Sequence, residues 1–485
     1  MNRILLFVGL ISLTFLNDLI GQVRLPALFS SNMVLQRDTL VQIWGWSEAQ
    51  EKITIQPSWL KTELSVMADH TGKWRIGLPT TASKEAQTIL FKGKDTEVAI
   101  ENILFGEVWL CSGQSNMQMP VKGNMGEPIH GALQAIISAR NPNLRLFTIQ
   151  NFGSMEPLSD IERYRSWTEA TPESVSNFSA VAYFFGEQLQ HTLDIPVGII
   201  HSSWGGSFVE AWISRDSLQG YHEILPDSAY DLTKANRVPT ALFNAMINPL
   251  IPLTIKGVLW YQGESNRLDP GQYLKLFPLM VGDWRARWGL GNFPFYFAQI
   301  APFSYGKSKE AFETSENSAF IRESQLKCSE IIANSGIAIT MDLGDETSIH
   351  PPSKKEVADR LLYLALQQTY NFKGLNGRSP SYKSSVIGDK FIRLNFNDVG
   401  SGLYTFGDLK HFEIAGEDRV FYPAVAKIVN RTAVEVSSDK VLKPVAVRYG
   451  WKNYLIGDLY GGNLLPVSSF RTDDWDDASR AQGSK

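Results

Sequence analysis

The stretch "LCSGQSNMQM", residues 110–119, ends an apolar run with a glycine, two serines and two amides at positions 112–116. The preceding residues, Val108-Trp109-Leu110-Cys111, are typical of a buried strand. A serine placed after a strand, in a turn opened by Gly113, is exposed as a nucleophile must be. The turn is therefore either an ordinary connection or a site that presents Ser115 for chemistry. It is not a Gly-x-Ser-x-Gly elbow, because Met117 stands where the second glycine is required.

This stretch lies in a region where buried-strand runs alternate with helix-like segments. The strand candidates are Glu107–Leu110, Leu144–Ile149, Val197–His201, Gly257–Tyr261, Phe295–Ile300 and Ile337–Met341. Apolar residues at helical spacing predict helices that include Val181–Leu189, Tyr273–Trp288 and Phe320–Cys328. Ser353-Lys354-Lys355-Glu356 has the pattern of a capping box at the start of a last helix. The alternation predicts an α/β fold with a doubly wound parallel sheet covered by helices on both faces.

On both sides of this region the hydrophobic period is two. Val41–Trp46 and Lys52–Ile55 alternate before it, and Phe391–Phe396 and Ala433–Val436 alternate after it. Short alternating runs separated by turn residues are typical of antiparallel, sandwich-like β structure. The expected organisation is a signal peptide (1–21), an N-terminal β-sandwich domain (22–102), the catalytic α/β domain (103–372), a C-terminal β-rich region (373–475) and a tail (476–485).

The N-terminus has the pattern of a secretory signal. Met1-Asn2-Arg3 is positively charged, Ile4–Leu16 is nearly all apolar, and Gly21-Gln22 offers a cleavage zone. The apolar run is shorter than the roughly 18–20 residues that span a membrane. We therefore expect an exported protein, periplasmic or secreted, with no membrane anchor.

Composition excludes several classes of function. The chain of 485 residues has a net charge of −4 and no long block of Lys or Arg, which argues against nucleic-acid and anionic-membrane partners. Zinc, P-loop and dinucleotide motifs are absent, so we expect no metal and no cofactor. Cys111 and Cys328 are the two cysteines, and the sequence leaves open whether they pair. It does not indicate the oligomeric state.

Polar clusters follow four of the strand candidates. They are Ser112–Asn116, Ser202–Ser207, Gln262–Asn266 and Asp342–His350. Ligands of doubly wound sheets bind at the carboxyl ends of the strands, so these four clusters are expected to converge on one pocket.

A serine nucleophile needs a base and donors for the oxyanion. Of seven histidines, His350 is favoured because Asp342, Asp345 and Glu346 lie just upstream, and His201 at the end of a strand candidate is its rival. The pair Gly205-Gly206 allows backbone N–H groups to approach a ligand closely. A side-chain donor is expected from Gln262 or Asn266.

These clusters carry a resemblance that extends over the expected mature chain. The matching stretches are Phe105–Val121, Ser202–Ser214, Ile255–Asn266 and Asp342–Pro351, followed by Phe412–Ala424 and Ser468–Trp475. In them the chain resembles the sialate O-acetylesterases of the SGNH/GDSL hydrolase superfamily, a group that includes acetylesterases acting on plant polysaccharides.

The resemblance implies roles for particular residues. Ser115 would be the nucleophile and His350 the general base, with the backbone amides of Ser115 and Gly206 and the side chain of Gln262 forming the oxyanion hole. Asn116 and Glu264 would shape the pocket.

The resemblance leaves the third triad member open. Many members of the superfamily carry an aspartate two or three residues before this histidine, where this chain has Ser348 and Thr347. Either Asp345 orients His350, or a backbone carbonyl does so and leaves a dyad.

The expected function is that of an exported serine esterase that removes O-acetyl groups from a carbohydrate, with an O-acetylated glycan as its partner. O-acetylated sialic acid is the preferred substrate, and acetylated xylan or another plant polysaccharide is the alternative. A non-catalytic glycan-binding protein on an esterase scaffold is the rival from another class.

Overall fold

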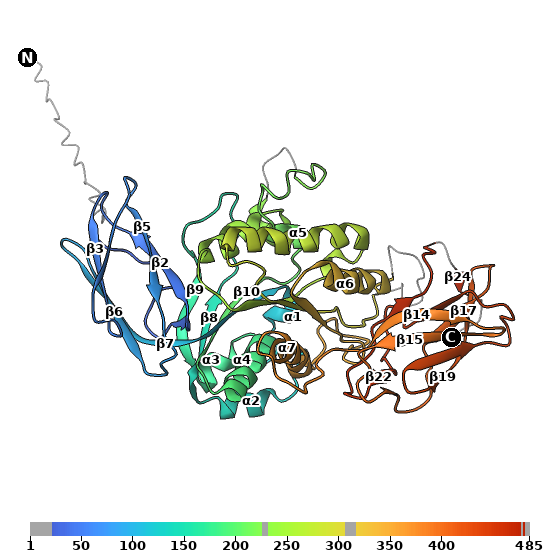
Figure 1. Cartoon of the computed structure of the whole chain (residues 1–485). Coiled ribbons are helices and arrows are strands. Elements are labelled where there is room, and N and C mark those ends of the chain that lie inside the picture. Colours follow the sequence, from blue (N-terminus) through green and yellow to red (C-terminus); the bar gives the residue numbers. More distant parts are fainter. Residues whose placement is uncertain (1–21, 226–230, 306–316, 477–478, 481–485) are drawn as a thin grey trace, which may run out of the picture.

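The computed structural model describes residues 22–225, 231–305, 317–476 and 479–480. An N-terminal β region, a central α/β domain and a C-terminal β region follow one another along the molecule (Figure 1). The expected signal peptide, residues 1–21, lies outside the described residues, as does most of the expected tail. Across the described parts of the chain, no helix is long and apolar enough to cross a membrane.

The central sheet is the doubly wound sheet that the sequence predicts. Its strands are β7 (Glu97–Gly113), β8 (Asn141–Ile149), β9 (Tyr164–Ala170), β10 (Val197–Ser203), β11 (Gly257–Tyr261), β12 (Phe295–Ala298) and β13 (Ser335–Ala338). They lie in the order β13-β12-β11-β7-β10-β8-β9. All neighbours are parallel except the edge strand β9, which is antiparallel to β8. The predicted strands are confirmed, although β12 ends at Ala298 rather than at Ile300 and β13 ends at Ala338 rather than at Met341.

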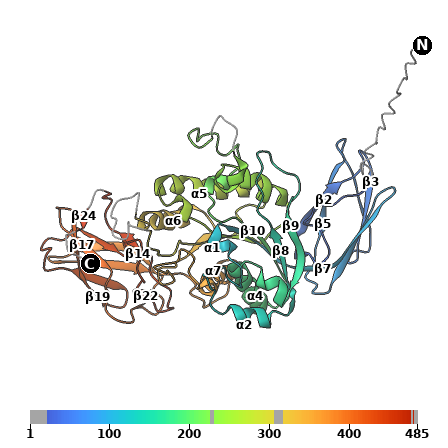
Figure 2. The ribbon, with the colours of Figure 1, turned by 180° about the vertical axis from the view of Figure 1, so that it is seen from behind.

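Helices cover both faces of this sheet (Figures 1 and 2). The longer helices are α4 (Ala180–Leu193), α5 (Pro270–Trp288), α6 (Ala319–Ile331) and α7 (Lys354–Gln368), and the shorter ones are α1 (Ser115–Gln118), α2 (Ala132–Ser138) and α3 (Pro172–Ser176). Short helical turns are η1 (Val209–Trp212), η2 (Leu232–Arg237), η3 (Phe243–Ile247), η4 (Asn248–Leu250) and η5 (Glu264–Asn266). The predicted helices are confirmed. The predicted capping box is wrong, because Ser353 occupies the N-cap of α7 without a hydrogen bond from its side chain to the helix.

Alternation along β7 supplies a core to each face of the sheet. Trp109 and Cys111 join the apolar cluster that includes Phe184 of α4 and Leu361 of α7. Leu110 points the other way, into the cluster that contains Trp284 of α5. Because side chains of a strand alternate between faces, one continuous apolar run serves both layers. The two cysteines are free, buried thiols, Cys111 in the first cluster and Cys328 in the second.

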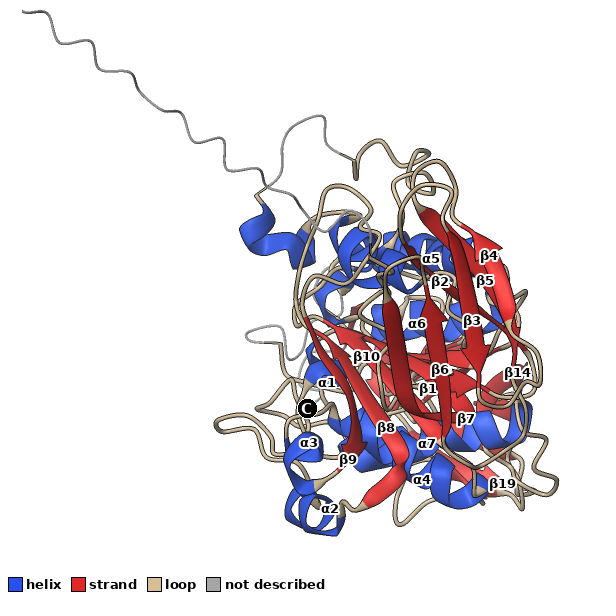
Figure 3. Cartoon of the chain, turned by 90° about the vertical axis from the view of Figure 1, so that its left-hand side faces the viewer, coloured by secondary structure: helices blue, strands red, loops and turns tan. Residues whose placement is uncertain are grey.

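The N-terminal region consists of two packed β layers (Figure 3). Its strands are β1 (Val34–Gln36), β2 (Leu40–Trp46), β3 (Lys52–Pro57), β4 (Leu64–Met67), β5 (Lys73–Pro79) and β6 (Gln87–Lys92). The strands β2 and β5 pair with each other, while β3 pairs with β4 and β6. The first part of β7 pairs with β6, and the same strand continues into the central sheet between β10 and β11.

The C-terminal region is also β-rich, as predicted. Its strands are β14 (Ser381–Ile387), β15 (Phe391–Asn397), β16 (Leu403–Tyr404), β17 (Phe412–Ala415), β18 (Val420–Pro423), β19 (Val425–Val429), β20 (Ala433–Ser437), β21 (Ala446–Tyr449), β22 (Tyr460–Gly461), β23 (Phe470–Arg471) and β24 (Ser479–Arg480). They form a four-stranded and a five-stranded sheet and one further pair. Arg448 and Asp473 form an ion pair at 2.6 Å whose side chains are almost fully buried.

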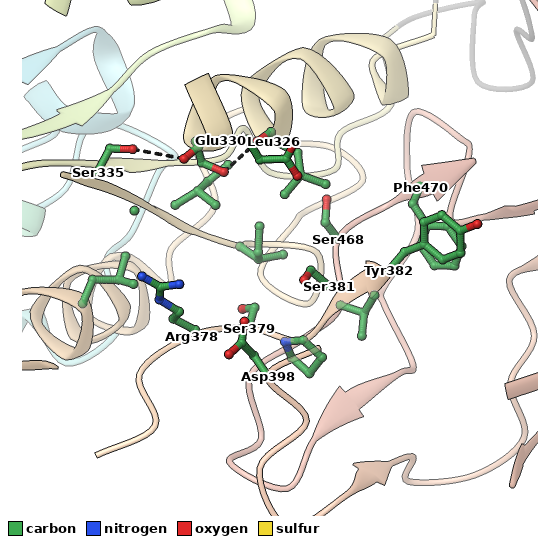
Figure 4. Close-up of a pocket in the computed structure, with 17 residues that line it drawn as sticks. Leu326, Glu330, Ser335, Arg378, Ser379, Ser381, Tyr382, Asp398, Ser468 and Phe470 are labelled. Carbon is green, nitrogen blue, oxygen red and sulfur yellow. Dashed lines mark hydrogen bonds between the residues drawn. The ribbon is translucent and has the colours of Figure 1, made fainter. Parts of the chain in front are cut away.

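A cavity of about 310 Å³ lies where this region meets the central domain (Figure 4). Arg378 and Asp398 line one part of it, and Tyr382 and Phe470, whose rings stack, line another. None of the residues that the sequence places in the candidate site lines this cavity.

Candidate active site

Three neighbouring strands, β10, β7 and β11, end together. Ser203, Gly113 and Tyr261 lie side by side in register at their carboxyl ends. The chain leaves β7 toward β8 on one side and adds β11, β12 and β13 on the other, so β7 is the switch point of the sheet, where ligands bind. Gly113 has a φ of 136°, and a Cβ there would lie 2.2 Å from the carbonyl oxygen of Tyr261. Only glycine can therefore open the turn that leads to Ser115.

Ser115 and His350 meet at this edge. Ser115 is the first residue of α1, and His350 lies in the loop that returns from β13 to α7. The Oγ of Ser115 is 2.8 Å from Nε2 of His350, a hydrogen-bond distance. Both residues are partly exposed, so a substrate can reach them. The structure therefore brings together the two residues that the sequence favours as nucleophile and base.

The carboxylate on the other side of the imidazole is Glu127. Its Oε1 is 2.6 Å from Nδ1 of His350. Burial alone raises the pKa of Glu127, but hydrogen bonds with His350 and Asn124 outweigh it and hold that pKa below its ordinary value. A carboxylate in this position fixes the imidazole tautomer and stabilises the imidazolium. The arrangement is a Ser115–His350–Glu127 triad in geometry.

The structure corrects the prediction that Asp345 orients His350. The carboxylate of Asp345 accepts hydrogen bonds from the backbone N–H groups of Thr347 and Ser348 and from the Thr347 hydroxyl. These bonds lower the pKa of Asp345 and fold its side chain back onto its own turn. A short aspartate side chain satisfied in this way cannot also reach the ring of His350, five residues further on.

Sequence reasoning missed Glu127 because nothing near His350 indicates it. Glu127 lies in the loop between α1 and α2, 223 positions before the histidine. The available signal was the polar segment Asn124–Glu127, which follows the nucleophile turn and contains a left-handed Gly126. That signal indicates a tight turn, but it does not indicate that the Glu127 carboxylate faces His350.

The Gly205 peptide lies directly against the nucleophile. Its N–H donates to Oε1 of Gln118 at 2.8 Å, and its carbonyl accepts from Nδ2 of Asn236 at 2.8 Å. A Cβ on Gly205 would lie 3.3 Å from the Cβ of Ser115. Within the described residues, no hydrogen bond uses the backbone N–H of Ser115 or of Gly206. Both N–H groups are therefore free to donate to a ligand, and their role as an oxyanion hole stays a prediction.

Gln262 does not supply the predicted side-chain donor. It is completely buried, and its Nε2 donates to the carbonyl of Ser207 at 3.0 Å and to Oδ1 of Asn266 at 2.7 Å. Asn266 in turn donates to Glu210 at 3.0 Å. The amide protons of Gln262 are therefore used to join the loops after β10 and β11, which corrects the expectation of a direct contact with the oxyanion.

Asn116 and Glu264 belong to a buried polar network beneath the site. The Nδ2 of Asn116 donates to Oε1 of Glu264 at 2.6 Å and to the carbonyl of Ile349 at 3.1 Å. The Oδ1 of Asn116 accepts from Nζ of Lys354 at 2.5 Å. Burial raises the pKa of Glu264 and lowers the pKa of Lys354 to about 7, although Glu264 and Glu127 oppose the second shift. Sequence reasoning assigned Lys354 only to a capping box and missed this network.

His201, the rival base, lies outside the site. Its Nε2 is 2.5 Å from Oγ of Ser203, and its ring packs edge-on against Phe178. Burial lowers the pKa of His201 to about 4, which keeps the ring neutral. The described part of the chain also contains no group of three His, Cys, Asp or Glu side chains that could hold a metal ion.

Comparisons with known proteins give similarities over most of the chain. Residues 106–367 match the sequence model of a family described as "Carbohydrate esterase, sialic acid-specific acetylesterase". Human sialate O-acetylesterase is 30% identical over 472 residues, covering 89% of this chain and 88% of that protein. The mouse sialate O-acetylesterase is 29% identical over 496 residues, covering 89% and 90%. The crystal structure of a carbohydrate acetylesterase from Xanthomonas citri superposes with a TM-score of 0.85 at 36% identity, covering 93% of this chain and all of that one.

Proposed function

This chain belongs to the sialic acid-specific acetylesterase family of carbohydrate esterases, and from that premise we propose that it deacetylates O-acetylated sialic acid through Ser115 and His350. As a member of that family it is a carbohydrate O-acetylesterase. The observation that carries the proposed mechanism is the continuous contact from Ser115 through His350 to Glu127, at 2.8 and 2.6 Å.

The first half of the reaction acylates Ser115. Its Oγ attacks the acetyl carbonyl carbon while Nε2 of His350 takes the hydroxyl proton. Glu127 accepts the Nδ1 proton in a hydrogen bond and stabilises the imidazolium as it forms. The oxyanion lies against the N–H groups of Ser115 and Gly206, each donor contributing about 3 kcal/mol to stabilisation of the transition state. Collapse breaks the ester bond, and His350 returns its proton to the sugar oxygen.

The second half regenerates the enzyme. Water attacks the acetyl carbon of acetyl-Ser115, and His350 removes a proton from this water. The same two N–H groups bind the second oxyanion. Its collapse releases acetate and returns the proton to Oγ of Ser115.

Two further features are part of the proposal. The pattern of residues 1–21 supports export to the periplasm or the medium. The sialic acid-specific family and relatives favour sialate as substrate. The second candidate is another acetylated carbohydrate, such as the acetylated xylan considered from the sequence, because the solved relative from Xanthomonas citri is described as a carbohydrate acetylesterase without a named sugar.

The test measures acetate released by residues 22–485 from 9-O-acetyl sialic acid, from acetylated xylan and from p-nitrophenyl acetate. Ser115→Ala and His350→Ala are the inactive variants, and His201→Ala is the matched histidine control. Release from the sialate by wild type, lost in the first two variants and retained in the third, supports the proposal. Release of acetate from xylan alone would show that the substrate is acetylated xylan rather than sialate. Full activity of Ser115→Ala would refute the proposed mechanism. A reporter fused to residues 1–21 tests export by its location.

A further inference from the structure

Lys354 joins the two loops that carry the nucleophile and the base. Its Nζ donates to Oδ1 of Asn116 at 2.5 Å and to the carbonyl of Pro351 at 2.8 Å. Asn116 follows Ser115 in the chain, and Pro351 follows His350. One buried amine therefore bonds to the immediate neighbours of both residues that the mechanism uses.

A lysine at this position is costly for folding. Its side chain is fully buried, with the Tyr261 ring 6.0 Å from Nζ. The charged groups that influence it are Glu264, whose carboxylate is bonded to Asn116, and Glu127, which is bonded to His350. An apolar side chain of similar volume commonly fills such a site without the desolvation cost of a cation. The reason for a lysine here must therefore lie in the residues that its hydrogen bonds connect.

We propose that Lys354 is a positioning residue, which ties Asn116 to Pro351 and so keeps Oγ of Ser115 within hydrogen-bond reach of Nε2 of His350. The inference rests on the proposed function of Ser115 and His350. The two loops come from distant parts of the chain, one after β7 and one after β13. Beyond the contact between the reacting side chains, Asn116 also donates to the carbonyl of Ile349, so Lys354 and Asn116 together bond to the residues on both sides of His350.

The consequence is kinetic. Without the Nζ bridge, the 2.8 Å contact between Ser115 and His350 is no longer fixed from both loops. A displacement of 1 Å at a reacting pair costs about a hundredfold in rate. The acetyl group and its sugar do not touch Lys354, so the loss falls on kcat and leaves KM unchanged.

The test uses Lys354→Met, which keeps an unbranched side chain of similar volume and removes the donor. The matched control is Lys355→Met, one position further along α7, where Nζ instead pairs with Asp359 at 2.7 Å near the surface. Each variant is assayed with p-nitrophenyl acetate, and its Ser115 is labelled with a fluorophosphonate. For Lys354→Met we expect kcat and the labelling rate constant to fall about a hundredfold, at unchanged KM, with labelling still reaching one group per chain. Lys355→Met should match wild type.

The labelling stoichiometry separates positioning from misfolding. A merely structural role lowers the labelled fraction, whereas a positioning role lowers the rate at which all chains are labelled. Should Lys354→Met fail to fold, Asn116→Ala breaks the same bridge from the other end and must give the same loss. Wild-type kcat and labelling rate in a folded Lys354→Met or Asn116→Ala chain overturn the inference, as does loss of stoichiometry alone. A wild-type protein that is not labelled at Ser115 overturns instead the proposed function.

Discussion

Replacing Glu127 with glutamine removes one negative charge from the back of the imidazole while preserving the shape of the side chain. The carboxylate lies 2.6 Å from Nδ1 of His350, and the two side chains are 27% and 20% exposed. An effective dielectric constant of about 20 suits a pair near the surface, where opposite charges about 4 Å apart attract by about 4 kcal/mol. This attraction is present only when His350 is protonated, as it is in the transition states. At 1.36 kcal/mol per tenfold, its loss lowers kcat about a thousandfold.

The equivalent change in a protease triad lowers kcat about ten-thousandfold, and we take this as the upper limit of the expected loss. The assay is steady-state hydrolysis of p-nitrophenyl acetate, repeated with the acetylated glycan. Asp345→Asn is the matched control, since it removes the carboxylate that the sequence favours but the structure turns away from His350. We expect Asp345→Asn to keep the kcat of wild type. A Glu127→Gln enzyme with more than about a tenth of wild-type kcat, or a larger loss in Asp345→Asn, would refute the triad reasoning.

Three further outcomes are expected. Between pH 7 and 10, wild type should gain stability over Lys354→Met by up to about 1.4 kcal/mol per pH unit in urea unfolding. The folded-state pKa of about 7 lies below the unfolded 10.5, so the unfolded chain binds the extra proton, and a flat difference would contradict this pKa. Asp473→Asn leaves the Arg448 charge buried and should cost about 3–5 kcal/mol in thermal unfolding. Gly205→Ala places a Cβ 3.3 Å from that of Ser115, a contact that a shift of a few tenths of an ångström relieves, so kcat should fall by less than about a hundredfold at unchanged Tm. A kcat equal to that of wild type would contradict the expected displacement of Ser115.

The sequence predicts the elements that depend on local periodicity. The buried runs that become β10 and β11 and the apolar faces of α4 and α5 are visible from spacing alone, because each element buries what its own pattern dictates. Ser115 and His350 follow from the resemblance of whole motifs. Their meeting at 2.8 Å needs the switch in strand order at β7, which no local pattern encodes.

The residues that support the site could not be predicted in this way. Glu127 and Lys354 contact residues that are far away in the sequence and come close only in the folded chain. Each also fits its local position, Glu127 in a turn and Lys354 at the start of a helix, so neither is conspicuous in the sequence. Asp345 was favoured because it is near His350 in sequence, yet backbone N–H groups closer still satisfy its carboxylate. Gln262 shows the same effect, because its amide group already donates hydrogen bonds to Ser207 and Asn266 and has no proton left for a ligand.

The unbroken course of β7, from Glu97 to Gly113, has a consequence for how such a protein is assembled from parts. The strand crosses position 102/103, where the pattern of the sequence divides two domains, and it ends two residues before Ser115. A gene fusion or excision at that point cuts a shared strand rather than a linker. Recombination therefore cannot exchange the N-terminal layers as an independent unit. Replacing them would also replace the first part of β7, the strand whose other end leads to Ser115.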